Sequence, residues 1–174
     1  DVEKGGIIHR DIKCANILIN ENGVVKLADF GCSQIFVSVN SISQNSNNEL
    51  LGTIPWMAPE AINHAKEHVG RKSDIWSFGC TIIEMATARH PWPKSNNIYS
   101  IMHKVASTDA TPEIPESLGE MGATFLQHCF RRNQSSRWSA GHLLEDDFVK
   151  LTEDELKDQH KQTIDWELLN SIEK

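Results

Sequence analysis

The sequence predicts a fold of the α+β class, in which a small β-hairpin precedes a mainly helical body. Two short apolar runs, at residues 17–19 and 24–28, flank an Asn-Glu-Asn-Gly segment. The Asn-Gly step readily adopts positive φ and therefore favours a hairpin turn. Farther along, apolar residues recur with a helical period between residues 73 and 88, and their number indicates a buried helix.

Apolar periodicity predicts helices through most of the second half of the chain. The first is expected at residues 73–88, where Ser73 or Asp74 can serve as the N-cap. Three more are predicted, at residues 98–105, 122–130 and 139–148. By contrast, residues 32–49 are polar and without a clear period, which predicts a surface loop.

Charge is distributed unevenly along the 174 residues. Seventeen Lys and Arg residues oppose 24 Asp and Glu residues, which gives a formal net charge of −7. Residues 145–174 alone hold ten acidic and four basic residues, a net of −6. We therefore assign residues 1–149 to one domain and residues 150–174 to an acidic, helical tail. Because the sequence has no basic stripe, we expect neither a nucleic-acid nor a membrane partner.

The cysteines and the hydropathy pattern predict a cytoplasmic protein. The four cysteines are widely spaced and form no Cys-x-x-Cys pair, which favours reduced thiols over a zinc or disulfide framework. No apolar stretch approaches the roughly 18 residues that a membrane span requires. The chain also opens without a signal-like segment.

Two polar clusters, before and after the predicted hairpin, carry the chemistry. The first is His-Arg-Asp-Ile-Lys-Cys-Ala-Asn at residues 9–16, and the second is Asp-Phe-Gly at residues 29–31. Phosphoryl transfer from a magnesium nucleotide requires a carboxylate for the attacking hydroxyl, a cation for the phosphoryl group and oxygen ligands for Mg²⁺. A hairpin between the clusters is expected to bring them to opposite sides of one metal–phosphate site.

These clusters, together with Ala-Pro-Glu at residues 58–60, resemble the protein-kinase signatures in their order. Asp-Ile-Trp-Ser-Phe-Gly at residues 74–79 and Arg137 extend the resemblance over nearly the whole chain. The resemblance implies a protein-kinase-like fold, here its mainly helical C-terminal lobe with a small hairpin at the cleft. It also implies an enzyme that uses ATP and Mg²⁺.

The resemblance implies a role for polar residues of both clusters. Asp11 would be the catalytic base, and Lys13 would contact the γ-phosphate of ATP. Asn16 and Asp29 would hold Mg²⁺. A lysine at position 13 also implies transfer to Ser or Thr rather than to Tyr. Finally, Leu18 would pack under the adenine ring.

A set of supporting residues is implied in the same way. Thr53 would line the peptide site beside Asp11. Asp74 would accept hydrogen bonds from the backbone of the first cluster. Glu60 and Arg137 would form a buried ion pair. Removing one partner of such a pair costs about 3–5 kcal/mol, because the other charge stays buried.

Arg10 is implied to pair with a phosphate on the activation segment. Four serines of the polar loop are candidate phosphate acceptors: Ser38, Ser41, Ser43 and Ser46. A second hypothesis is that Glu49 offers Arg10 a permanent negative charge. The competing interpretation, which we favour, is an ordinary solvated glutamate.

Three further segments resemble MAP kinase kinase kinases of the MEKK type, at residues 6–13, 70–77 and 84–87. This resemblance implies a MAP kinase kinase as the protein substrate, within a MAPK signalling cascade. One departure is Pro55, where such kinases commonly carry an aromatic residue. It bears on the selectivity for the peptide rather than on the chemistry.

The sequence contains neither a Gly-rich G-x-G-x-x-G loop nor the lysine and glutamate that such kinases pair over ATP. We therefore expect a fragment that lacks the N-terminal lobe. Phosphoryl transfer depends on positioning and electrostatics, so the fragment alone is expected to be inactive or nearly so.

Three alternative interpretations stay open. A non-catalytic pseudokinase or interaction module is the alternative to an enzyme, although the four polar residues that the chemistry needs are present. The His-Ala-Lys-Glu-His pattern at residues 64–68 matches a zinc-protease motif, but it has little apolar face, so a polar loop is favoured. The segment at residues 152–172 is either a helix packed on its own domain or a docking segment for a partner.

Overall fold

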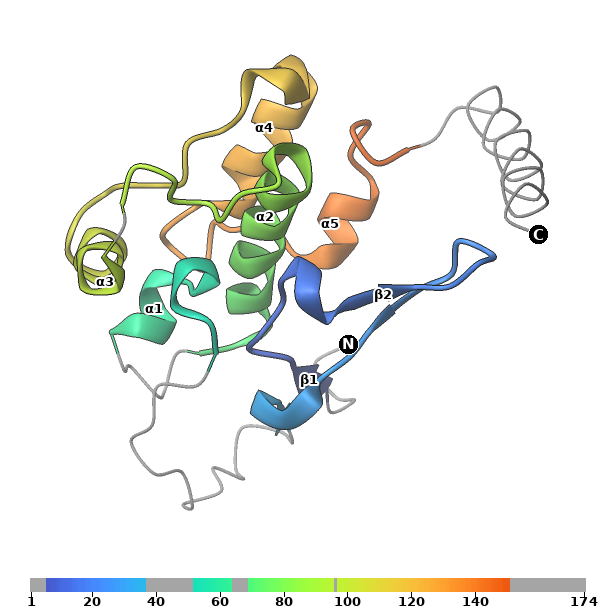
Figure 1. Ribbon diagram of the computed structural model, residues 1–174, viewed down its shortest axis with the longest axis horizontal. Helices are drawn as coiled ribbons and strands as arrows, with labels where there is room; N and C mark the ends of the chain where they lie inside the picture. Colours follow the sequence, from blue (N-terminus) through green and yellow to red (C-terminus); the bar gives the residue numbers. More distant parts are fainter. Residues whose placement is uncertain (1–5, 37–51, 64–68, 96, 151–174) are drawn as a thin grey trace, which may run out of the picture.

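The computed structural model describes residues 6–36, 52–63, 69–95 and 97–150. Its helices are α1 (Pro59–Ile62), α2 (Arg71–Thr87), α3 (Ile98–Ser107), α4 (Gly119–Cys129) and α5 (Ala140–Leu144). Its strands are β1 (Gly6–Ile8), β2 (Ile17–Ile19), β3 (Val25–Leu27) and β4 (Gln34–Phe36). α2 runs through the middle of the helical body, and the β2–β3 hairpin projects on the side opposite to α3 (Figure 1).

The predicted hairpin is confirmed. β2 and β3 pair antiparallel, with Ile17 opposite Leu27. Gly23 adopts a φ of 73° in the turn, a conformation that costs glycine little. The side chain of Asn20 closes the turn, because its Oδ1 accepts hydrogen bonds from the backbone of Asn22 and Val24.

The prediction of a loop at residues 32–49 is wrong at its start. Residues Gln34–Phe36 form β4, which pairs antiparallel with β1. A strand of three residues is too short to show a period, and its partner lies far away in the sequence, so local patterning could not identify it. Residues 37–51 lie outside the described residues. The candidate phosphate acceptors and Glu49 are therefore not described.

The boundaries of α2 also differ from the prediction. The helix begins at Arg71 with Gly70 as its N-cap, so neither Ser73 nor Asp74 caps it. Both side chains lie in the first turn and bond to other segments instead. The helix predicted at residues 139–148 is shorter than expected, since α5 comprises only Ala140–Leu144.

Two sequence patterns lie outside the described residues. They are the His-x-x-Glu-His pattern at residues 64–68 and the acidic tail from residue 151 onward. Within the described part, none of the helices combines the length and the apolar character that crossing a membrane would require.

The core lies where α2 packs against α4. Trp76 of α2 and Phe125 of α4 are fully buried, and the rings of Trp76 and Phe130 pack edge to face with their centroids 5.2 Å apart. Gly79 makes this close packing possible. A Cβ atom at that position would lie 2.9 Å from the Cβ of Cys129 and 2.9 Å from the ring of Phe130.

Replacing Gly79 with alanine is expected to lower the free energy of unfolding by about 1–3 kcal/mol, because the added methyl group overpacks the α2–α4 contact. Gly141→Ala is the matched control, since a Cβ there meets only the Ser139 hydroxyl, at 3.8 Å. That change should be neutral or slightly stabilising. Urea unfolding measures both. Equal midpoints for the two variants would contradict the packing argument.

Candidate active site

The loop that follows β1 is fixed by Asp74 of α2. Its carboxylate accepts hydrogen bonds from the backbone N–H of His9 at 2.8 Å and of Arg10 at 2.9 Å. These two bonds hold Arg10 at a φ of 69°, which is unusual for a residue with a Cβ. Burial raises the pKa of Asp74, and the two backbone hydrogen bonds oppose that shift only in part. Asp74 therefore sets the shape of the loop on which the first polar cluster lies.

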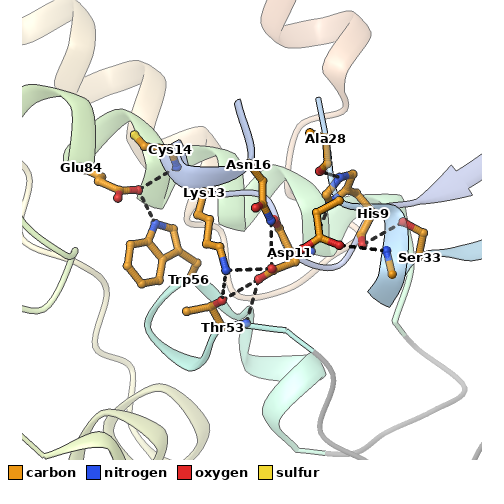
Figure 2. A network of polar contacts seen from close by, with 12 residues as sticks. His9, Asp11, Lys13, Cys14, Asn16, Ala28, Ser33, Thr53, Trp56 and Glu84 are labelled. Atoms are coloured by element: carbon orange, nitrogen blue, oxygen red, sulfur yellow. Dashed lines mark hydrogen bonds and ion pairs between the residues drawn. The ribbon is translucent and has the colours of Figure 1, made fainter. Parts of the chain in front are cut away.

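Asp11 is buried at the centre of this cluster (Figure 2). Thr53 donates to its Oδ1 through the backbone N–H at 3.0 Å and through the hydroxyl at 2.7 Å. Asn16 donates to its Oδ2 at 2.9 Å, and the ammonium of Lys13 lies 2.8 Å from the same oxygen. Burial would raise the pKa of Asp11, but the bonds from Lys13 and Thr53 outweigh it and lower that pKa below its usual value. The carboxylate is therefore ionised and fixed in orientation.

Lys13 joins the loop to the segment that contains Thr53. Its Nζ donates to the Thr53 hydroxyl at 2.6 Å as well as pairing with Asp11. The side chain remains 22% exposed, so part of it is in contact with solvent. A positive charge, a hydroxyl and a carboxylate thus meet at one place in the site (Figure 2).

The second cluster is tied to the first through Ala28. Its N–H donates to the carbonyl of Asn16 at 2.9 Å, and its carbonyl lies 3.0 Å from Nε2 of His9. Asp29 follows directly, exposed and at a φ of 60°, with its Oδ1 accepting from the N–H of Gly31. These contacts bring the start of the Asp-Phe-Gly motif against the loop.

Leu18 stands apart from this polar network. It lies on β2 opposite Lys26, and its side chain is 57% exposed. The described residues therefore cover only part of it.

Gly52 allows the loop after β1 and the segment that contains Thr53 to approach each other. It adopts a φ of 114°, and a Cβ at this position would lie 2.5 Å from the carbonyl oxygen of Arg10. Glycine is required on both counts. The close approach places the following residue, Thr53, within reach of Asp11 and Lys13.

Glu60 and Arg137 form a buried ion pair behind the site. The two guanidinium nitrogens lie 2.6 and 3.1 Å from the two carboxylate oxygens. The side chain of Arg137 is fully buried, and that of Glu60 is 9% exposed. Ser73 adds a hydrogen bond to Glu60 at 2.8 Å. The pair connects the segment after Thr53 to the connection between α4 and α5.

Arg10 has unused hydrogen-bonding capacity. Its Nε is buried, and no partner for it is found within the described ranges. Burial lowers the pKa of Arg10, while the charge of Asp74 opposes that shift.

Sequence reasoning assigned no role to two residues of this network. His9 is buried, bonds to Ala28 and meets the ring of Phe30 at 4.8 Å. Glu84 of α2 accepts hydrogen bonds from Cys14 and from Trp56. A signal for Glu84 exists in the sequence, since it is an acidic residue within an apolar helical run.

Comparison with known proteins places these motifs in a family. Residues 3–149 match the family model described as protein kinase domain. The chain is 45% identical over 151 residues to human mitogen-activated protein kinase kinase kinase 4 (Homo sapiens), an alignment that covers 86% of this chain and 9% of that protein.

Two further relatives come from distant organisms. Mitogen-activated protein kinase kinase kinase A of Dictyostelium discoideum is 44% identical, over 87% of this chain and 15% of its own length. Mitogen-activated protein kinase kinase kinase 3 of Arabidopsis thaliana is 40% identical, over 85% of this chain and 22% of its own length. The chain thus spans less than a quarter of each of these proteins. With the family match covering most of its length, the chain belongs to the protein kinase family and is similar to MAP kinase kinase kinases.

Proposed function

We propose that the protein transfers the γ-phosphate of ATP to a Ser or Thr hydroxyl of a protein substrate and acts as a MAP kinase kinase kinase. One observation carries the proposal: the ionised carboxylate of Asp11 is held by hydrogen bonds from Thr53 and Asn16 and by the ammonium of Lys13. Asp11, Lys13 and Asn16 belong to the first kinase motif, and Thr53 precedes the Ala-Pro-Glu motif by five residues. The names of the relatives support the place in the cascade.

Asp11 suits the role of the base that accepts the proton of the attacking hydroxyl. Both of its oxygens are oriented by donors, so the carboxylate does not need to reorganise when a substrate hydroxyl approaches. Its lowered pKa keeps it ionised near neutral pH. Lys13, whose ammonium lies 2.8 Å from Asp11, would neutralise charge on the transferred phosphoryl group.

Asn16 and Asp29 suit a Mg²⁺ site by the chemistry of their donors. The Asn16 amide nitrogen donates to the Asp11 backbone carbonyl and carboxylate, which leaves its Oδ1 available as a ligand. Asp29 adds an exposed carboxylate, and Mg²⁺ prefers such oxygens. When bound, ATP would supply the phosphoryl group, and Mg²⁺ would neutralise its charge. Leu18, partly exposed on β2, would contact the adenine.

The proposed substrate is a MAP kinase kinase, and the proposed location is the cytoplasm. The acidic net charge of −7 supports a protein partner rather than a nucleic acid or an anionic membrane. The family match at residues 3–149 supports our division into a domain at residues 1–149 and a separate tail.

Arg10 would connect the site to regulation. Its buried Nε, which finds no acceptor in the part of the chain that the structure describes, supports the pairing with a phosphate on residues 37–51. Such a bond would add to the two that Asp74 makes with the same loop.

The test is transfer of labelled γ-phosphate from ATP to a kinase-inactive MAP kinase kinase by the full-length protein, with the Asp11→Asn variant in parallel. Transfer to Ser or Thr that the variant loses supports the proposal. A parent protein that transfers nothing, even when purified in its activated state, would overturn it. Transfer that persists in the variant would mean that the reaction does not depend on Asp11.

Replacing Thr53 with valine is expected to slow transfer about 10-fold, because the change removes a hydroxyl that bonds to the charged groups of Asp11 and Lys13. The backbone N–H of residue 53 remains available to Asp11. Thr53→Ser is the matched control, since it keeps the hydroxyl. Initial rates at saturating ATP measure both, and equal losses in the two variants would contradict a role for the hydroxyl.

A further inference from the structure

A pocket of about 600 Å³ is formed around α5, the last helix labelled in Figure 1. Its lining residues all lie within residues 138–147, which comprise α5 and the segments on either side of it. None of the residues that form the candidate active site is among them. The proposed phosphoryl transfer therefore gives this pocket no role.

Trp138 gives the pocket an aromatic lining. Its side chain is half-buried, and the indole lies parallel to the imidazole of His128, with an interplanar angle of 7° and ring centroids 3.6 Å apart. This stacking covers one face of the indole and fixes the plane of the ring. The part of the indole that lines the pocket is therefore presented in a fixed orientation.

The two histidines beside the indole leave its ring electrons available to a ligand. Burial and the charge of Arg131 lower the pKa of His128, and Asp146 opposes that shift only in part, so the imidazole is neutral near neutral pH. A neutral ring does not compete with a cation for the indole. His142 is held by Ser139, whose Oγ lies 2.7 Å from its Nδ1.

Three consecutive carboxylates line the pocket beside the indole: Glu145, Asp146 and Asp147. Asp146 is fixed, because its Oδ1 accepts a hydrogen bond from the N–H of Phe148 at 2.9 Å. Glu145 lies 3.6 Å from the ammonium of Lys150, but these side chains are 81% and 51% exposed, so solvent screens the pair. The lining residues include no lysine or arginine. The pocket is thus negatively charged.

An aromatic ring beside carboxylates is a combination that suits a guanidinium group. The face of an indole attracts a cation electrostatically. Arginine adds two features to this attraction, since its planar group stacks on a ring and donates two parallel hydrogen bonds to a carboxylate. A lysine ammonium can do neither. An acidic ligand would meet charge of its own sign.

The charge of this chain favours another protein as the source of the arginine. Residues 151–174 contain seven acidic and three basic residues, a net of −4, and no arginine. The whole chain has a formal net charge of −7, so a second copy would also approach against repulsion. A basic segment of a partner protein is complementary to the pocket in both charge and chemistry.

We propose that the pocket around α5 binds an arginine of a basic segment in a partner protein. The guanidinium would lie against the indole of Trp138 and bond to the two exposed carboxylates, Glu145 and Asp147. The inference goes beyond the proposed kinase activity and does not depend on it. It assigns a docking site that is separate from the residues of the proposed chemistry.

The probe is a fluorescein-labelled peptide in which three arginines alternate with glycines. Its binding to the full-length protein is measured by fluorescence anisotropy at about 0.15 M salt, where attraction over long distances is screened. We expect saturable binding. The matched peptide with lysines in place of arginines should bind at least about 3-fold more weakly, because an ammonium cannot stack on the indole.

Variants of the full-length protein test each part of the pocket. Trp138→Leu is expected to weaken binding of the arginine peptide about 3- to 10-fold, and Trp138→Phe should recover most of that loss. Glu145→Gln combined with Asp147→Asn removes two charges at nearly constant shape and should weaken binding about 5- to 10-fold. Glu116→Gln is the matched control, since this exposed carboxylate does not line the pocket.

Crosslinking locates the bound peptide independently of the variants. A benzophenone at one end of the arginine peptide should crosslink, on irradiation, within or next to residues 138–147, as mapped by mass spectrometry. An excess of unlabelled arginine peptide should suppress these crosslinks. Should Trp138→Leu fail to fold, this measurement on the parent protein and the double amide variant still decide the question.

Four results would overturn the inference. A Trp138→Leu variant that binds as tightly as the parent would mean that acidic surface alone attracts the peptide. Equal binding of the lysine and arginine peptides would exclude recognition of a guanidinium. Crosslinks confined to other parts of the protein would place the binding elsewhere. Spermine that displaces the peptide at an equal or lower concentration would assign the pocket to a small polyamine instead of a protein segment.

Discussion

The Asp11→Asn variant is expected to lose about 10²- to 10⁴-fold in the rate of phosphoryl transfer, the range typical for removing a general base. Asparagine cannot accept the proton of the attacking hydroxyl. It also places an amide N–H₂ group among donors, since Thr53, Asn16 and Lys13 all point hydrogen atoms at this carboxylate. Because those donors hold the pKa of Asp11 below its usual value, protonation of Asp11 should not limit the parent enzyme near neutral pH.

The measurement is kcat and KM for transfer of labelled γ-phosphate by the full-length protein. Glu120→Gln is the matched control, because it makes the same carboxylate-to-amide change on an exposed residue of α4. Near-ultraviolet circular dichroism of both variants should match the parent, which separates lost chemistry from lost folding. An Asp11→Asn variant within about 3-fold of the parent would exclude the general-base role.

Local patterning was sufficient where neighbouring residues determine the structure. The β2–β3 hairpin follows from an Asn-Gly step between two apolar runs, and the structure has it there. The position of α2 along the chain also follows from the period of its apolar residues. Its first residue, Arg71, could not be predicted from that period. Gly70, rather than a side-chain cap, precedes the helix, so Ser73 and Asp74 are available to Glu60 and to the loop.

Contacts between distant segments were beyond local patterning. β4 forms because its backbone meets β1, and nothing within Gln34–Phe36 predicts that pairing. The motifs indicated that Asp11, Lys13 and Thr53 lie together, but only through a resemblance to kinases. The contacts of Glu84 with Cys14 and Trp56 were not predicted, because the sequence shows only an acidic residue within a helix and not the two distant donors that bond to it.

Side chains of α2 hold the segments that form the site. Along this one helix, Asp74 holds the loop after β1, Ser77 holds the carbonyl of Trp56, and Glu84 joins that segment to the loop. On the same helix, Trp76 and Cys80 are buried in the core. The helix thus transmits the rigidity of the α2–α4 core to the segments that carry the proposed chemistry.

The Arg137→Ala variant is expected to lose about 3–5 kcal/mol in the free energy of unfolding. The change removes both bonds to Glu60 and leaves that carboxylate buried, with the Ser73 hydroxyl as its remaining side-chain donor among the described residues. It also removes donors to the backbone carbonyls of Lys72 and Arg131. Urea unfolding followed by tryptophan fluorescence measures the loss.

Two comparisons identify the ion pair as the cause. Lys94→Ala breaks an exposed pair with Glu113 and should cost less than about 1 kcal/mol, because solvent screens both charges. Arg137→Met combined with Glu60→Leu should be more stable than either single change, since no buried charge is then left unpaired. Arg137→Ala with an unfolding midpoint equal to that of Lys94→Ala would mean that the buried pair does not stabilise the helical body. In that case the segment after Thr53 must depend on its bonds to Ser77 and Trp92.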